Sequence, residues 1–330
     1  MKSVICFGTR PEWLKVKPLL ESSTRFKTLF TGQHSSLING INFDFEIEIN
    51  ESSNRLDSII ANSLEQFPEE QFESVLVQGD TASAFACALA AFHRKIPIIH
   101  LEAGLRSYDL CHPYPEEGYR QLISRIADVH LCPTELSKSN LMSENPSGQI
   151  HVVGNSILDS LLPFKGQEYY GNKILVTLHR RENQDSMSDW FNAIEAIAIK
   201  YPKLEFIIPV HPNPEIQAIA SIFKKVQVVP ALEHHELLQI LMASKLIISD
   251  SGGIQEEGSF FNKKVLVCRE TTERPEGVGT GHLHLCPTPN SLKQKFDVMI
   301  EDFEISQPCP YGDGNTATNV NRILNDYNNS

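Results

Sequence analysis

Long hydrophobic runs are absent from this 330-residue sequence. No segment approaches the ~20 consecutive apolar residues that a membrane-spanning helix needs. The apolar stretch near the start, within MKSVICFGTRPEW, is too short for the core of a secretory signal. We therefore expect no membrane partner and a cytoplasmic location.

Positive charge is also in short supply. Lys and Arg total 29 against 41 Asp and Glu, which gives a formal net charge of −12. Nucleic-acid-binding proteins usually present a basic field, so this balance argues against nucleic acid as a partner. A small anionic ligand stays possible, because a few Arg and Lys side chains can make one region of an acidic protein positive.

The sequence lacks the cysteine and glycine signatures of common cofactor sites. Its seven cysteines are scattered and form no CxxC pair, which predicts buried reduced thiols rather than zinc or redox chemistry. They are Cys6, Cys87, Cys111, Cys132, Cys268, Cys286 and Cys309. No Walker loop or GxGxxG fingerprint is present, so ATP hydrolysis and NAD use are not expected. We predict neither a metal nor a cofactor.

What the sequence does contain is an alternation of short apolar runs with longer amphipathic ones. The apolar runs are rich in Val and Ile, as in parallel strands buried on both faces. They are Ser3–Gly8, Thr28–Gly32, Ser74–Gly79, Ile96–Glu102, Val129–Cys132, Ile174–His179, Phe206–His211, Val226–Pro230, Leu246–Asp250 and Val265–Arg269. The amphipathic runs predict helices at Arg10–Ser22, Thr81–Arg94, Glu116–Ala127, Ser186–Lys200, Glu233–Ala243 and Ile254–Phe261. This alternation predicts an α/β fold with doubly wound parallel sheets.

The alternation restarts after Leu161–Asn172, a stretch that contains Pro, Gly and polar residues but has no clear period. A length of 330 residues also favours two domains, at roughly 100–200 residues per domain. We therefore predict two Rossmann-like domains, residues 1–165 and residues 166–315. The last residues, Asn319–Ser330, predict a short helix and a polar tail.

Acidic side chains follow the strands of the first predicted domain. Asp80 and Glu102 each follow an apolar run, at the strand end where parallel sheets bind ligands. If the helix Thr81–Arg94 is the right-handed crossover between these strands, both carboxylates share one rim. Glu116 opens the next predicted helix. Taken singly, Asp80 could cap a helix and Glu116 could complement a helix dipole, whereas Glu102 has no helix start to cap.

The second predicted domain has histidines and glycines at its strand ends. His179 and His211 each end an apolar run, and two such histidines suggest a lined cleft, although a single one is more often structural. Ser251–Gly253 joins a strand to a helix, where glycines and free N–H groups favour a phosphate. Arg10 and Arg274 fit diphosphate binding near such a loop.

These segments resemble the UDP-N-acetylglucosamine 2-epimerase family, in its non-hydrolysing branch. The resemblance extends along nearly the whole chain, and the matching segments keep the order and spacing of the family. They are GTRPEWLKVKPL (Gly8–Leu19), TGQH (Thr31–His34), GDT (Gly79–Thr81), HLEAGLRS (His100–Ser107), PEEGYR (Pro115–Arg120), PTELSKSNL (Pro133–Leu141), VGNSILD (Val153–Asp159), TLHRREN (Thr177–Asn183), PVHPNP (Pro209–Pro214), SDSGGIQEE (Ser249–Glu257), TTERPEGV (Thr271–Val278) and PYGDG (Pro310–Gly314).

The resemblance implies two Rossmann-like domains facing across a cleft, in the glycosyltransferase-B arrangement, with the active site in the cleft. It also implies that the C-terminal helix, residues 316–330, packs back on the first domain. The family's essential acids correspond to Asp80, Glu102 and Glu116, and its essential histidine to His179. The implied nucleotide and diphosphate contacts are Arg10, Lys15, His211, Ser251, Gly252, Gly253, Glu257 and Arg274.

The reaction that the resemblance implies is inversion at C2 of a UDP-sugar, without a cofactor and in a homodimer. UDP leaves first to give a 2-acetamidoglucal, and UDP then adds back with the proton returned on the other face. A carboxylate base must take the weakly acidic C2 hydrogen and a second acid must return a proton. Three acids supply both roles, and which is base and which is acid stays open at this point. His179, Arg274 and the helix end at Ser251–Gly253 would stabilise the leaving UDP.

The chain departs from the family in the region between Gln33 and Gly79, which is short. The substrate could therefore be a modified UDP-sugar. Gln33 and His34 match the loop beside which regulated family members bind UDP-N-acetylglucosamine as an activator. Ser35 and Ser36 follow where longer polar side chains are usual, and a serine hydroxyl reaches less far. We therefore predict weak or absent activation.

Three other functions stay open. They are a hydrolysing epimerase that releases N-acetylmannosamine and UDP, a glycosyltransferase of the same fold, and a UDP-sugar-binding module without activity. The segments TGQH and TTERPEG favour the non-hydrolysing branch over the first. A transferase would not need Asp80, Glu102 and Glu116 together, and no expected catalytic position is lost, which argues against an inactive module.

Overall fold

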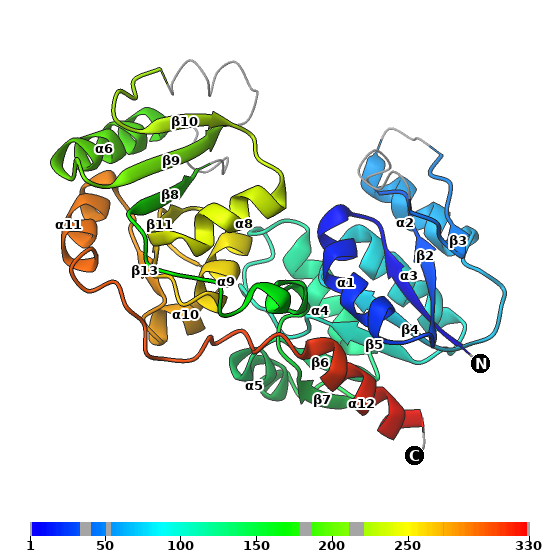
Figure 1. Cartoon of the computed structure of the whole chain (residues 1–330). Coiled ribbons are helices and arrows are strands. Elements are labelled where there is room, and N and C mark those ends of the chain that lie inside the picture. Colours follow the sequence, from blue (N-terminus) through cyan, green and yellow to red (C-terminus); the bar gives the residue numbers. More distant parts are fainter. Residues whose placement is uncertain are drawn as a thin grey trace. The chain divides into compact units, whose positions relative to one another are not determined.

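The computed structural model describes residues 2–33, 41–50, 54–178, 186–210, 221–272 and 274–328 (Figure 1). The chain divides into two compact units. The first unit comprises Met1–Leu162 and Gly312–Ser330, and the second unit comprises Pro163–Tyr311. Each unit contains its own parallel sheet with helices packed on it, so the predicted α/β class is confirmed.

The first unit is built on a seven-stranded sheet in the order β3-β2-β1-β4-β5-β6-β7, with all neighbours parallel. Its strands are β1 (Lys2–Phe7), β2 (Phe26–Phe30), β3 (Phe45–Glu46), β4 (Phe72–Gln78), β5 (Ile98–Leu101), β6 (Val129–Cys132) and β7 (Gln149–Val152). Its helices are α1 (Arg10–Ser22), α2 (Arg55–Glu65), α3 (Ala82–His93), α4 (Glu116–Ile126), α5 (Glu135–Glu144) and α12 (Thr316–Asn328). The 3-10 helix η2 (Ser156–Phe164) begins in the first unit and ends two residues into the second.

Successive side chains of a strand point to opposite faces of this sheet, and both faces are apolar. Ile5 and Phe7 of β1 belong to a cluster that includes residues of α1 and α12. Val4 and Cys6 of the same strand belong to a second cluster, with residues of α3 and α4. The near-continuous apolar composition of β1 therefore reflects burial on both sides, as expected for a parallel sheet.

The C-terminal helix α12 completes the core of the first unit. Val320 packs in the same cluster as Val16 of α1. The carboxylate of Asp159 accepts hydrogen bonds from the backbone N–H groups of Thr316 at 3.0 Å and Ala317 at 2.7 Å. These bonds satisfy donors that are otherwise free at a helix start. A carboxylate 157 residues from Thr316 in the sequence thus fixes where α12 begins.

The second unit is built on a six-stranded sheet in the order β10-β9-β8-β11-β12-β13, again with all neighbours parallel. Its strands are β8 (Lys173–Thr177), β9 (Glu205–Val210), β10 (Gln227–Pro230), β11 (Ser244–Ser249), β12 (Val265–Val267) and β13 (Leu283–Leu285). Its helices are α6 (Met187–Lys200), α8 (His234–Met242), α9 (Gly252–Phe260), α10 (Pro275–Gly279) and α11 (Pro289–Met299). Trp190, Phe191 and Phe296 fill its core together with the apolar side chains of the central strands.

The strands and helices predicted from the apolar and amphipathic runs are present, with ends that differ by at most two residues from the prediction. The C-terminal helix α12 begins at Thr316, three residues before the start that the pattern predicted, because Asp159 accepts hydrogen bonds from its first N–H groups. The described elements that the pattern did not predict are β3, β7, β13, α2, α5, α10, α11 and η2, and the strands among them are short. No helix in the described part of the chain is long and apolar enough to cross a membrane.

The prediction of buried thiols is confirmed for five cysteines, namely Cys6, Cys87, Cys132, Cys268 and Cys286. It is wrong for Cys111, which is exposed, and for Cys309, which is half-buried. Both lie in loops rich in proline and polar residues, outside the apolar runs on which the prediction depends. Burial follows the strand pattern, and these two cysteines are not part of it.

Candidate active site

Both sheets reverse their strand order at one point, which is where open α/β sheets bind ligands. In the first unit the reversal lies between β1 and β4, so the loops after these strands flank it. The loop after β4 contains Asp80. In the second unit the reversal lies between β8 and β11, and Ser251 follows β11. In each unit, the topology therefore favours ligand binding at the loops that contain predicted site residues.

Asp80 lies in the turn after β4, with its side chain one quarter exposed. Its Oδ2 accepts from the guanidinium of Arg120, with 2.7 Å to Nε and 2.5 Å to NH2. Its Oδ1 has no hydrogen bond to any described residue. The possibility that Asp80 caps α3 is wrong, because the N-cap is Thr81, whose side chain accepts from the N–H of Ala84 at 3.0 Å.

Glu102 follows β5 with a left-handed backbone conformation, at a φ of 65°. Such a φ is costly for a residue with a side chain, and strain of this kind gathers at functional sites. Its Oε2 accepts from Nζ of Lys15 at 2.5 Å and also from Nε2 of Gln78. Its Oε1 has no hydrogen bond to the described residues. One oxygen is thus held by a cation and an amide, and the other is available for chemistry.

Glu116 is the first residue of α4, preceded by Pro115, which makes no side-chain cap. Its Oε2 is buried and has no hydrogen-bond partner among the described residues. Asp80 and Glu116 are linked through α4: Arg120, which pairs with Asp80, lies one turn after Glu116. Residues four apart share a face of a helix. Glu116 therefore belongs to the same edge as Asp80, but no cation pairs with it among the described residues.

The loop after β1 is held by a buried carboxylate. Oε2 of Glu12 accepts from the N–H of Gly8 at 3.0 Å and from Oγ1 of Thr9 at 2.8 Å. Its Oε1 accepts from Oγ1 of Thr81, in the loop after β4, at 2.6 Å. Burial raises the pKa of Glu12, and these hydrogen bonds partly oppose the rise. The two loops at the strand reversal are thus joined, while Arg10 is exposed and has no described partner.

A buried histidine joins β5 to the turn before Asp80. Nε2 of His100 donates to the carbonyl oxygen of Gly79 at 2.8 Å. Burial lowers the pKa of His100 to about 3, so the ring is neutral at physiological pH. Gln33, a predicted regulatory residue, accepts through Oε1 from the N–H of Ser83 at 3.2 Å and from Oγ of Ser83 at 2.7 Å. Its side-chain oxygen is therefore used within the unit.

In the second unit, the predicted site includes the main chain at the start of a helix. Helix α9 begins at Gly252, with Ser251 as its N-cap. A methyl group on Gly253 would meet no atom within 4 Å among the described residues outside its own helix, so no described side chain covers this side of the helix start. A methyl group on Gly252 would lie 2.6 Å from NH1 of Arg274. Free N–H groups, open space and an adjacent guanidinium together favour a phosphate group at this edge.

Two carboxylates of α9 flank this edge. Glu256 accepts from Nε of Arg274 at 2.7 Å, which fixes the guanidinium beside Gly252. Oε1 of Glu257 pairs with Nε2 of His234 at 2.9 Å. Its Oε2 is buried without a hydrogen-bond partner among the described residues. A buried acceptor without a donor is costly, and a ligand hydroxyl would satisfy it.

The predicted site residues thus form two groups, one in each unit. The first unit contains Arg10, Lys15, Gln33, Asp80, Glu102 and Glu116, and the second contains Ser251, Gly252, Gly253, Glu257 and Arg274. His34, His179 and His211 lie outside the described residues. The described residues contain no group of three potential metal ligands.

Sequence reasoning missed the partners of the acids. Arg120 pairs with Asp80, Gln78 with Glu102, and His234 with Glu257. The position of Arg120, one helical turn after Glu116, is a signal that could have revealed the first of these. The other two depend on which strands and helices become neighbours, so no local pattern shows them.

This chain is similar to known proteins along its whole length. A family model described as UDP-N-acetylglucosamine 2-epimerase matches residues 19–325. A UDP-N-acetylglucosamine 2-epimerase of Neisseria meningitidis is 36% identical over 361 residues, covering 96% of this chain and 97% of the relative. A relative from Campylobacter jejuni with the same name is 34% identical over 374 residues, covering 98% of this chain and 97% of the relative.

Solved structures agree with this similarity. The crystal structure of the UDP-GlcNAc 2-epimerase from Neisseria meningitidis bound to UDP-GlcNAc has a TM-score of 0.83 and 34% identity, covering 99% of this chain and 100% of that one. Acinetobacter baumannii MurG has a TM-score of 0.65 at 14% identity, covering 99% and 100% of the two chains, which shows a shared fold alone.

Proposed function

Because this chain belongs to the UDP-N-acetylglucosamine 2-epimerase family and is an isomerase of that family, we propose that it interconverts UDP-N-acetylglucosamine and UDP-N-acetylmannosamine without hydrolysing them. The relative from Neisseria meningitidis solved with UDP-GlcNAc bound supports a UDP-sugar as substrate. A modified UDP-2-acetamido sugar fits the same chemistry, and the short region between Gln33 and Gly79 leaves that variant open.

The main support is the difference between the surroundings of the three acids. Asp80 and Glu102 each present one oxygen to a cation, Arg120 and Lys15 respectively. Their other oxygens have no hydrogen bond to the described residues. Glu116 has no cation beside it among these residues, and one of its oxygens is buried without a donor. Acid–base chemistry on two faces of one carbon needs unlike groups, and this edge supplies them.

We assign the first proton transfer to Glu102. Its Oε1 takes the C2 proton while Lys15 and Gln78 hold Oε2. The electron pair of the C2–H bond forms a C1=C2 double bond, and the C1–O bond to UDP breaks with its electrons on the diphosphate. In the second half, UDP attacks C1 and C2 receives a proton on the opposite face. We assign that proton to Glu116 and electrostatic support to Asp80.

The second unit supports the leaving group in this proposal. The start of α9 at Gly252 and Gly253 and the guanidinium of Arg274 stabilise the negative charge that develops on the diphosphate. Glu257 accepts a nucleotide hydroxyl on its unpartnered oxygen. His179 and His211 complete the UDP contacts, and Arg10 and Lys15 supply positive charge from the first unit, as the family resemblance implies.

Product analysis tests the proposal against its alternatives. Incubation with UDP-N-acetylglucosamine alone should give UDP-N-acetylmannosamine, visible by NMR of the sugar C1 and C2 protons. Free N-acetylmannosamine with UDP would instead indicate the hydrolysing branch. No change with any UDP-2-acetamido sugar would indicate a transferase or a binding module.

Other parts of the proposal depend on the sequence and on the family resemblance, without support from the described structure. They are a homodimer, a cytoplasmic location, a role in supplying polysaccharide biosynthesis, and weak activation by UDP-N-acetylglucosamine. The last concerns His34, Ser35 and Ser36, which lie outside the described residues. Light scattering tests the homodimer. Turnover of UDP-N-acetylmannosamine without any gluco-epimer tests the activation, because a strictly regulated enzyme would stall.

A further inference from the structure

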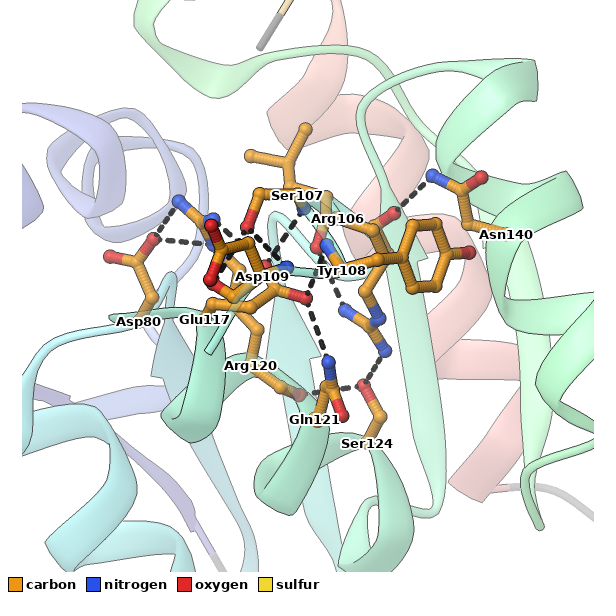
Figure 2. A network of polar contacts seen from close by, with 12 residues as sticks. Asp80, Arg106, Ser107, Tyr108, Asp109, Glu117, Arg120, Gln121, Ser124 and Asn140 are labelled. Atoms are coloured by element: carbon orange, nitrogen blue, oxygen red, sulfur yellow. Dashed lines mark hydrogen bonds and ion pairs between the residues drawn. The ribbon is translucent and has the colours of Figure 1, made fainter. Parts of the chain in front are cut away.

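A second carboxylate of α4 is fully buried and accepts four hydrogen bonds (Figure 2). Oε2 of Glu117 accepts from the N–H of Ser107 at 2.9 Å and from NH1 of Arg120 at 3.3 Å. Its Oε1 accepts from the N–H of Tyr108 at 3.2 Å and from Nε2 of Gln121 at 2.9 Å. Both oxygens are fully engaged, so Glu117 does not act on a substrate itself.

The guanidinium of Arg120 lies between Glu117 and Asp80 (Figure 2). Nε and NH2 face Oδ2 of Asp80, and NH1 faces Glu117. The group is planar, so its orientation toward one carboxylate sets its orientation toward the other. Arg120 is only 8% exposed, which leaves it little room to rotate.

Glu117 is the fixed end of this chain of contacts. Burial by itself would raise the pKa of Glu117, but the hydrogen bonds from Gln121, from the two backbone N–H groups and from Arg120 outweigh it and lower the pKa. Glu117 therefore keeps its charge at neutral pH. Asp80, by contrast, is one quarter exposed and has only Arg120 as a described partner.

We propose that Glu117 and Arg120 are positioning residues that orient the carboxylate of Asp80, and that Glu117 does so through Arg120. This inference rests on the proposed function, since Asp80 is one of the three proposed acids. The competing explanation is that Glu117 only holds the loop of Ser107 and Tyr108. The two explanations differ in what happens to Asp80 when the charge of Glu117 is removed.

The same loop provides a matched control. Glu144 accepts two hydrogen bonds from buried Arg106, 2.7 Å from Nε to Oε1 and 2.9 Å from NH2 to Oε2. Arg106 precedes Ser107 in the sequence, so this pair also fixes the loop. Neither Arg106 nor Glu144 forms a hydrogen bond or ion pair with Asp80, Glu102 or Glu116 among the described residues. Glu144→Gln therefore disturbs the loop and spares the acids.

The test compares Glu117→Gln with Glu144→Gln in the full-length enzyme with UDP-N-acetylglucosamine. We expect Glu117→Gln to lower kcat by ~10–10²-fold, the cost of a misplaced catalytic group, with KM within about twofold of wild type. Glu144→Gln should leave kcat within about twofold. Equal losses of kcat in both variants, or no loss in Glu117→Gln, would overturn the inference.

A second measurement does not depend on turnover. In a double-mutant cycle, the melting-temperature changes of Glu117→Gln and Asp80→Asn should be non-additive, because both act on Arg120. Those of Glu144→Gln and Asp80→Asn should be additive. Additive changes in the first cycle would overturn the inference even in an active enzyme. If the wild-type enzyme is inactive but the first cycle is non-additive, the proposed function is wrong, whereas the link between Glu117 and Asp80 is supported.

Discussion

The edges of the two units that contain the predicted site residues differ in the groups that they present. At the edge of the first unit, charged side chains are arranged in ion pairs, such as Asp80 with Arg120 and Glu102 with Lys15. At the edge of the second unit, the main chain at Gly252 lies beside a guanidinium, and no described atom outside helix α9 lies near the methyl position of Gly253. Two sheets with the same strand order thus support different tasks. In the proposed function, the first edge serves proton transfer and the second holds an anion.

The two edges also use arginine differently. Arg120 is shared between two carboxylates, one of which is a proposed catalytic acid. Arg274 is held by Glu256 against the start of α9, where it adds to the positive end of the helix. We therefore propose that arginine orients an acid in the first unit and contributes to a diphosphate site in the second. Mutations at the two edges should therefore separate turnover from binding.

The largest difference between the effect on turnover and the effect on UDP binding is expected for substitution of Glu102. Glu102→Gln should lower kcat by ~10²–10⁴-fold, because an amide cannot take the C2 proton. Asp80→Asn and Glu116→Gln should also abolish useful turnover. UDP affinity, measured by calorimetry, should stay near wild type in all three. Glu46→Gln removes an exposed carboxylate of β3 and serves as control, with no expected change. Near-normal rates in all three amides would refute the proposed chemistry.

The next effect is a loss of folding stability at acidic pH, and it depends on the buried His100 of β5. The pKa of His100 is about 3 in the folded protein against a usual value of 6.5. The unfolded chain therefore binds an extra proton below pH 6.5, and folding stability falls as the pH drops toward 3. Between pH 6.5 and 5 the loss from this residue is about 2 kcal/mol.

Urea unfolding of wild type and His100→Gln at several pH values measures this loss. The variant is expected to be less stable at pH 7, because it changes a buried hydrogen-bonded ring. The diagnostic is the slope, since stability should fall less steeply with acid in the variant. Parallel slopes would mean that His100 titrates normally. UDP binding should not follow this slope, because the second unit does not contain His100.

The smallest effect is expected for an alanine substitution in the second unit. A matched alanine substitution in the first unit serves as its control. A methyl group on Gly253 meets no atom of the described residues outside its own helix, so Gly253→Ala should fold normally but obstruct a diphosphate. We expect UDP affinity to fall roughly tenfold, about 1.4 kcal/mol. Gly118→Ala adds the same methyl in open space on α4 and should leave UDP affinity unchanged. Equal UDP affinities in the two variants would remove the support for phosphate binding at α9.

The sequence was sufficient to predict the two parallel sheets, because strands buried on both faces are almost wholly apolar. It also placed Asp80 and Glu102 on one rim, because β4 and β5 are paired neighbours. It could not assign roles to the acids. Lys15 reaches Glu102 across 87 residues and Arg120 reaches Asp80 across 40, so the partners that distinguish the acids come together only in the fold.

Several short or partly exposed elements were not predicted, for a related reason. Strand β3 has two residues and β13 has three, too few to show a period. Strand β7 is not fully buried, so its sequence QIHV lacks the apolar run of the central strands. Helix α5 has the polar sequence ELSKSNLMSE with two fully buried side chains, Ser137 and Leu141. Such elements are specified by their neighbours rather than by their own pattern.

The most direct test of the division between the two edges is solvent isotope incorporation. The enzyme is incubated with UDP-N-acetylglucosamine in heavy water, and the sugar C2 position is followed by NMR. If Glu102 and Glu116 exchange protons with C2, every molecule of UDP-N-acetylmannosamine formed should contain deuterium at C2. Glu102→Gln should incorporate none while still binding UDP. Epimer that keeps its original C2 hydrogen would contradict the account.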